Sequence, residues 1–141
     1  MKTLFIAIMT TSMLLTSTHA LANNVTFIID DIKSDQGKVY VQLFQGEKNY
    51  QANNAYLSSI AIAKKGQITI TFNNLEDNDY GIRYFHDEND NSAMETNLFG
   101  MPIEGYGYSN SAKANYGPVE YQAIKFQVAD AAVTNRSTIN Y

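Results

Sequence analysis

The sequence predicts an all-β fold, a seven-stranded antiparallel β-sandwich with one long ordered loop. From Val25 onward, apolar and polar residues alternate with period two, and the alternating segments are rich in β-branched and aromatic residues. Turn-forming Asn, Asp and Gly separate these segments at intervals of about 8 to 12 residues. No stretch after the first 22 residues shows a 3.6-residue period over helical length.

The first 22 residues have the parts of a secretory signal peptide. Lys2 precedes an apolar run from Leu4 to Leu15, and the segment ends in Ala20-Leu21-Ala22. A run of about 12 apolar residues is too short to span a bilayer. We therefore expect cleavage after Ala22, one mature domain over residues 23–141, and a periplasmic or secreted protein without a transmembrane segment. An uncleaved membrane anchor is the alternative.

The strands of the mature domain follow from alternation bounded by turns. In the segment from Gln67 to Phe72, Ile68 and Ile70 point to one face while Thr69 and Thr71 point to the other. The turn chemistry of Ser34 to Gly37, where Gly37 is free to take a positive φ, predicts a hairpin between the first two strands. The expected strands are 25–29, 38–45, 56–63, 67–72, 80–85, 121–128 and 133–141, and 49–54 is expected to be a polar loop.

Regular alternation stops between Asp87 and Pro118. Loops of this length in compact domains are usually functional or disordered. We expect this loop to be ordered, because it contains seven apolar or aromatic side chains that can pack. They are Leu98, Phe99, Met101, Ile103, Tyr106, Tyr108 and Tyr116.

Composition excludes several classes of protein. The chain has no cysteine, which rules out disulfides, thiolate metal sites and a lipid-anchored lipoprotein. Without Lys2 the mature part carries 9 basic and 14 acidic residues, a net charge of about −5, and no basic cluster. Nucleic acid and anionic lipid are therefore not expected partners.

An acidic segment begins the long loop. Oxygen-bearing side chains stand at alternate positions, Asp87, Asn89 and Asn91, and again at Glu95. These are positions 1, 3, 5 and 9 of a loop that winds around Ca²⁺, although Ser92 replaces the usual glycine at position 6. We predict either a weak calcium site at these four residues or turns in which Asp and Asn cap their own backbone.

His86 is the only imidazole of the mature chain. A multi-histidine zinc site within one chain is therefore excluded, and no Gly-x-Ser-x-Gly motif supports a serine nucleophile. We expect no enzymatic activity. The alternative is a small envelope hydrolase that uses His86 with a carboxylate. Chemistry by a pair of carboxylates would use Asp87, Glu95 or Glu104.

A segment rich in glycine and tyrosine lies later in the loop. Tyr106 and Tyr108 alternate with Gly105 and Gly107, and tyrosine rings can stack on a sugar, a peptide or a protein surface. The other interpretation is that the segment folds back and plugs one end of the sandwich with its own rings.

The runs Tyr80 to Asn91, Glu95 to Asn110 and Tyr116-Gly117-Pro118 together resemble the DUF2141 family of exported bacterial proteins. The resemblance covers about 25–139, and its most specific part is Glu104-Gly-Tyr-Gly-Tyr-Ser-Asn110. It implies a single exported domain of unknown function with a prealbumin-like or immunoglobulin-like sandwich, related to transthyretin-like and Cna-B-like domains. Asp90 and Ser92 stand where that family commonly has glycine, Glu95 stands for its usual Asp, and Val119 for a second Pro.

These observations lead to one functional hypothesis. The protein is an exported, non-enzymatic binding or structural module, in which His86, Tyr106, Tyr108 and Asn110 contact the ligand. The partner would be an envelope protein, a peptide or a glycan of unknown identity.

Overall fold

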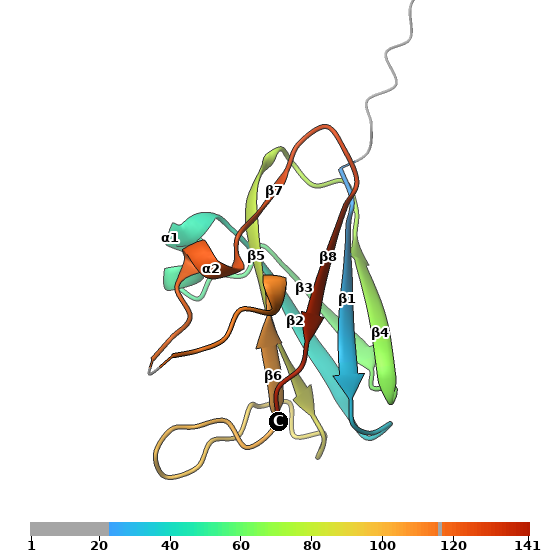
Figure 1. The fold of residues 1–141 in the computed structure, drawn as a ribbon, viewed down its shortest axis with the longest axis vertical. Coiled ribbons are helices and arrows are strands. Elements are labelled where there is room, and N and C mark those ends of the chain that lie inside the picture. The colour runs from blue at the N-terminus through green and yellow to red at the C-terminus, as the bar shows by residue number, and fades with distance from the viewer. Residues whose placement is uncertain (1–22, 116) are drawn as a thin grey trace, which may run out of the picture.

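A computed structural model describes residues 23–115 and 117–141. The predicted signal peptide, residues 1–22, and Tyr116 lie outside the described residues. The described chain is mostly β and forms a sandwich of two sheets, as the alternation predicted (Figure 1).

Residues 23–115 and 117–141 form eight strands, two short α-helices and one 3₁₀ turn. The strands are β1 Val25–Ile32, β2 Lys38–Gln45, β3 Leu57–Ile62, β4 Gly66–Phe72, β5 Asn78–Asp87, β6 Gly105–Tyr108, β7 Phe126–Val128 and β8 Val133–Thr138. The helical elements are α1 Gly46–Gln51, η1 Ser109–Ser111 and α2 Tyr121–Ile124.

The first sheet has the order β4-β1-β8, and the second has the order β3-β2-β5-β6. Strand β7 also pairs with β5, at residues 78–80, so that β6 and β7 share one edge of β5. All pairs are antiparallel except β1 with β8, which is parallel. The expectation of a purely antiparallel sandwich is therefore wrong at this one pair.

The core lies between the two sheets. Alternate residues of β1, β2, β4 and β5 point inward and are almost completely buried. Phe27 of the first sheet packs edge-on against Tyr84 of the second, with ring centroids 5.5 Å apart. The Tyr84 hydroxyl lies 2.7 Å from Ser137 Oγ, which donates to the Tyr108 carbonyl at 2.6 Å and so links the sheets by hydrogen bonds.

The predicted hairpin between the first two strands is wrong, because β1 and β2 lie in different sheets. The turn itself is where the sequence placed it. Gly37 has φ +70°, and a Cβ there would collide with the carbonyl of Asp87. Positive φ and this close approach both require glycine, but neither determines whether the chain returns beside the same strand or crosses to the other sheet.

Other boundaries also differ from the sequence prediction. The predicted strand 121–128 is helix α2 followed by β7, and the last predicted strand, 133–141, ends at Thr138. Part of the predicted loop 49–54 is helix α1, while β6 lies inside the segment that was expected to be irregular, so the strands number eight instead of seven.

Candidate ligand-binding surface

The solvent-facing side of the second sheet carries a row of aromatic and apolar side chains. The register aligns Ile60 of β3, Tyr40 of β2, Phe85 of β5 and Tyr106 of β6 across four strands. The Tyr40 and Phe85 rings are stacked, 5.0 Å apart and 9° from parallel. We call these four residues the outer row.

Helices α1 and α2 cover one end of this face. Phe44 and Gly81 are paired there, and Phe44 packs edge-on against Tyr50 of α1. A Cβ at Gly81 would collide with Ile124 and Tyr121 of α2, so glycine allows the helix to pack directly on the strand. The outer row therefore lies beside a small second core, which holds Val119, Tyr121 and Ile124.

Tyr106 and Tyr108 project from β6 on this outer face and are half-buried. Their rings meet edge to face with centroids 6.3 Å apart. Gly105 and Gly107 point inward, where a Cβ would collide with the rings of Tyr141 and Tyr84 respectively. The two tyrosines thus do not plug the end of the sandwich, and that interpretation is wrong.

The acidic loop, residues 87–95, stands at the other end of the outer face. Lys38 of β2 forms an ion pair with Asp90 at 2.6 Å, and the Tyr40 hydroxyl lies 2.9 Å from Ser92 Oγ. Glu104 is 5% exposed, and its two carboxylate oxygens accept the N–H groups of Glu88 and Glu95, each at 3.2 Å. This carboxylate therefore connects the two ends of the acidic loop.

Within the acidic loop, the four predicted calcium ligands hold the backbone and one another. The buried Asp87 carboxylate accepts the N–H groups of Asn91 and Ser92 at 3.1 and 2.8 Å. The side-chain amides of Asn89 and Asn91 donate to Glu95 at 2.9 and 3.1 Å. Asp and Asn therefore cap their own loop. Over residues 23–115 and 117–141, no three His, Cys, Asp or Glu side chains gather as metal ligands would.

A small closed hairpin, residues 96–103, follows the acidic loop and presents apolar side chains to solvent. Asn97 accepts the N–H groups of Phe99 and Met101 through Oδ1, and Thr96 forms a β-bridge with Pro102. We call its exposed side chains the apolar tip; they are Leu98 (102% exposed), Phe99 (90%), Met101 (62%) and Ile103 (58%). The expectation that these residues pack within the loop is wrong.

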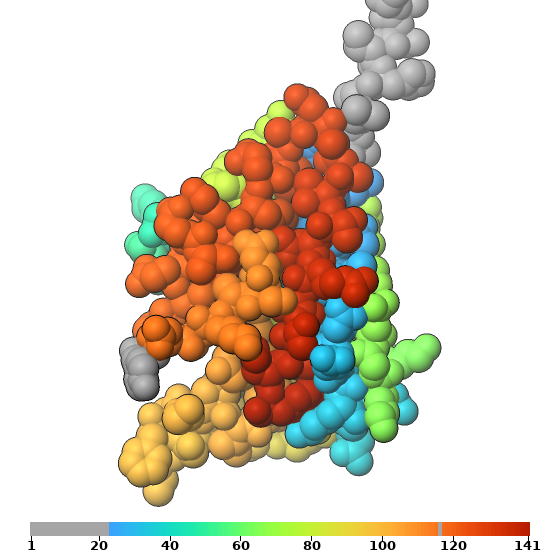
Figure 2. All heavy atoms as spheres, viewed as in Figure 1, coloured from blue at the N-terminus to red at the C-terminus, as the bar shows by residue number. Residues whose placement is uncertain are grey.

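A hollow of about 810 Å³ lies between the apolar tip and the residues 114, 115, 117 and 118. Figure 2 shows it between the golden loop at the lower left and the orange segment above it. We call this hollow the tyrosine groove. Its lining residues are Phe99, Gly100, Met101, Pro102, Tyr106, Tyr108, Ala114, Asn115, Gly117 and Pro118. Burial raises the pKa of Tyr108, so its hydroxyl is neutral there at physiological pH.

His86 faces the core and is completely buried. Its Nε2 lies 2.6 Å from the Gln36 carbonyl, which can only accept, so Nε2 carries the proton. Its Nδ1 lies 2.7 Å from the Tyr141 hydroxyl. The imidazole thus links Gln36, in the loop between β1 and β2, to Tyr141 at the end of the chain. It lies on the side of β5 away from the tyrosine groove.

Ser109 and Asn110 fasten β6 to the neighbouring elements. The Asn110 side chain donates to the carbonyls of Ala123 and Lys125 at 3.1 and 3.0 Å and accepts from Asn135 at 2.7 Å. Asn110 has φ +61°. Of the four predicted ligand contacts, the structure brings together Tyr106 and Tyr108 only; His86 lies behind them, and Asn110 is engaged with backbone at the end of β6.

Two features of this surface were not singled out from the sequence. Four apolar residues lie within the six positions that follow Asn97, and this cluster could have indicated an exposed tip as readily as a packed loop. Arg83 occupies an outward position of β5, between the inward-facing Ile82 and Tyr84, and period-two alternation alone predicts that placement.

A family of known sequences matches most of the chain. The family model described as an uncharacterized protein conserved in bacteria (DUF2141) matches residues 28–136. No curated protein and no solved structure matches the chain significantly. In the part of the chain that the structure describes, no helix has the length and apolar character needed to cross a bilayer.

Proposed function

Because the chain belongs to the DUF2141 family, which is described only as uncharacterized, we propose a function from the chain's own geometry. The protein is an exported, non-enzymatic binding module that holds an apolar segment of an envelope protein in the tyrosine groove. The observation that carries this proposal is the apolar tip, of whose four exposed side chains two, Phe99 and Met101, line the same hollow as Tyr106 and Tyr108.

The energetics of exposure support a binding role for the tip. Exposed apolar side chains gathered in one place mark interaction sites in soluble proteins, whereas single ones are common. The hairpin holds them in place without burying them, since Asn97 and the Thr96–Pro102 bridge fix its backbone. A partner would thus find the tip already ordered, which lowers the entropy cost of binding.

The position of His86 supports the non-enzymatic part of the proposal. A general base must reach the proton that it removes, and the His86 ring has no exposed surface and both nitrogens engaged. The hydrolase alternative would require this inter-sheet link to open for each turnover.

The decisive experiment compares capture of envelope proteins by the mature domain and by two variants. F99S and M101S combined remove the centre of the tip, while I62S removes an equally exposed side chain (Ile62, 81% exposed) from β3. We expect the tip variant to capture at least tenfold less partner than the parent, in keeping with the loss of a central hydrophobic contact. I62S should capture as much as the parent. Since all three side chains are exposed, melting temperatures should remain close to that of the parent.

Equal capture by the tip variant and by I62S would refute the groove as the binding site. Export is tested separately by mass spectrometry of the protein recovered from the periplasm or medium. A chain that begins at Asn23 is expected, and an intact Met1 in the membrane fraction would contradict export by a cleaved signal peptide.

We also propose that the acidic loop takes up calcium weakly. The support is that Asn89, Asn91 and Glu95 converge, because both amides lie within hydrogen-bonding distance of the Glu95 carboxylate. To coordinate the ion, the Oδ1 atoms of Asn89 and Asn91 would give up the N–H groups of Asn91 and Ala93, which they accept at 3.1 and 2.9 Å. With only two formal charges among the four ligands, the dissociation constant would lie at about 10⁻⁴ to 10⁻³ M.

A further inference from the structure

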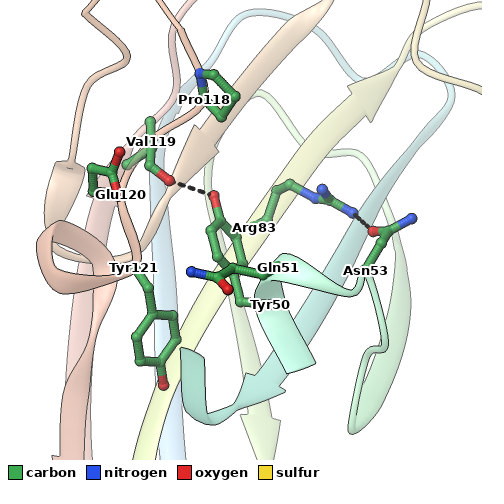
Figure 3. Close-up of a pocket in the computed structure, with 8 residues that line it drawn as sticks. All are labelled: Tyr50, Gln51, Asn53, Arg83, Pro118, Val119, Glu120 and Tyr121. Carbon is green, nitrogen blue, oxygen red and sulfur yellow. Dashed lines mark hydrogen bonds between the residues drawn. The ribbon is translucent and has the colours of Figure 1, made fainter. Parts of the chain in front are cut away.

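A second hollow, which we call the arginine pocket, lies on the same face beyond Pro118. Its volume is about 430 Å³, within the range of small-ligand sites. Figure 3 shows the segment 118–121 and Tyr50 of α1 on one side and the Arg83 side chain reaching from β5 toward Asn53 on the other. Its lining residues are Tyr50, Gln51, Asn53, Arg83, Pro118, Val119, Glu120 and Tyr121.

The guanidinium of Arg83 is held in place by neutral groups. Its Nη2 donates to Gln42 Oε1 and to Asn53 Oδ1, both at 2.6 Å. Its central carbon lies 5.2 Å from the centroid of the Phe44 ring. Two amide oxygens and an aromatic face fix the direction of the guanidinium, but they leave its positive charge without a counterion.

The charge of Arg83 is conspicuous because carboxylates are plentiful in this chain. All 14 acidic residues lie within the described residues, and none of them forms an ion pair with Arg83. The other arginine, Arg136, pairs with Asp30 at 3.1 Å. Glu120 lines the same pocket but makes no ion pair with Arg83. Because Nη2 uses both of its hydrogens on the two amide oxygens, Nε–H and the two Nη1 hydrogens of this half-buried guanidinium remain to donate single charge-assisted hydrogen bonds to a carboxylate.

We propose that the arginine pocket binds a small ligand through its carboxylate, with Arg83 as the anchor. Tyr50 and Pro118 offer apolar surface to the body of such a ligand, and the Tyr50 hydroxyl is already engaged by the Val119 carbonyl at 2.8 Å. The site is separate from the apolar tip, so this inference does not depend on the function proposed for the tyrosine groove.

The test uses the mature chain and two pairs of probes, each pair differing only in charge. N-acetyl-phenylalanine is compared with its amide, and glucuronic acid with glucuronamide, by NMR titration at millimolar concentrations. We expect at least one acid to bind about ten- to hundredfold more tightly than its amide, the effect of a hydrogen-bonded charged pair. The pair that shows this preference distinguishes a carboxylate on an amino-acid body from one on a sugar.

Variants then assign the preference to Arg83. R83Q should bind acid and amide equally, and R136Q should keep the preference. R83K should lose most of it, because a flexible ammonium lacks the planar group that the amides of Gln42 and Asn53 hold in one direction. Equal binding of acid and amide to the parent chain would overturn the proposal without reliance on any variant. Failure of all four probes to bind, or an unchanged preference in R83Q, would overturn it as well.

Discussion

Replacement of Ser109 by alanine tests how the candidate surface is fastened to the sandwich. Strands β6 and β7 pair with β5 at residues 83–86 and 78–80, which leaves a gap opposite Ile82. The completely buried Ser109 hydroxyl occupies this gap. Its oxygen accepts the Ile82 N–H at 2.9 Å, and its proton goes to the Ile124 carbonyl at 2.5 Å.

The expected magnitude follows from these two contacts. Alanine leaves one buried N–H and one buried carbonyl without partners, and each such group costs about 1–3 kcal/mol. We expect S109A to lower the free energy of unfolding by about 3 kcal/mol in total. For a domain of this size, that loss corresponds to a fall in melting temperature of about 10 °C.

The assay is urea unfolding followed by far-UV circular dichroism, because the chain has no tryptophan to report by fluorescence. S111A is the matched control. Ser111 lies in the same 3₁₀ turn, but it is exposed, and its Oγ accepts only the Thr138 N–H, at 3.1 Å. Water can replace that contact, so S111A should change stability by less than about 0.5 kcal/mol. If S109A and S111A changed the free energy of unfolding equally little, the hydrogen bonds of the buried Ser109 hydroxyl would not hold β6 to its neighbours.

Three further predictions concern the core, pH and calcium. G107A should force the Tyr84 ring away from Ser137 and lower the free energy of unfolding measured in urea. An unchanged free energy of unfolding would mean that the contact between Tyr84 and Ser137 does not stabilise the packing of the two sheets. Burial raises the pKa of Tyr84 and of Tyr121 above the ordinary 10.0, so the unfolded chain ionises first. Stability should be complete below pH 10 and fall by about 1.4 kcal/mol per pH unit per tyrosine above it, as measured by alkaline unfolding; ionisation of these hydroxyls in the folded chain near pH 10 would contradict this. Millimolar Ca²⁺ should raise the melting temperature by a few degrees in the parent and not in E95Q, and an equal response of the two proteins would exclude the loop site.

Strand positions could be predicted from the sequence because alternation is a local property. Gln67 to Phe72 alternates cleanly, and β4 contains all of it. The sheet to which a strand belongs is not local, which is why Ser34 to Gly37 was interpreted as a hairpin. The same turn residues serve a return to the same sheet and a crossing to the other one.

The weakest signals came from the shortest elements. Strand β6 has glycine at both inward positions, since Tyr84 and Tyr141 fill the space there, so the usual apolar alternation is replaced by aromatic side chains facing outward. Helix α2 spans four residues, too few to show a helical period. The candidate surface was therefore predicted in part. Tyr106 and Tyr108 are on it, whereas His86 points inward, as the period-two alternation that places Ile82 and Tyr84 inward also indicates.

The closure of the loop at Glu104 has an evolutionary consequence. Because that carboxylate holds both ends of the 88–95 segment, and the 96–103 hairpin is closed by its own bridge, the side chains beyond this point contribute little to folding. Substitutions at the tip can therefore accumulate without selection against unfolded protein. Homologous chains should keep Glu104 and the strands constant while the identity of the projecting residues diverges.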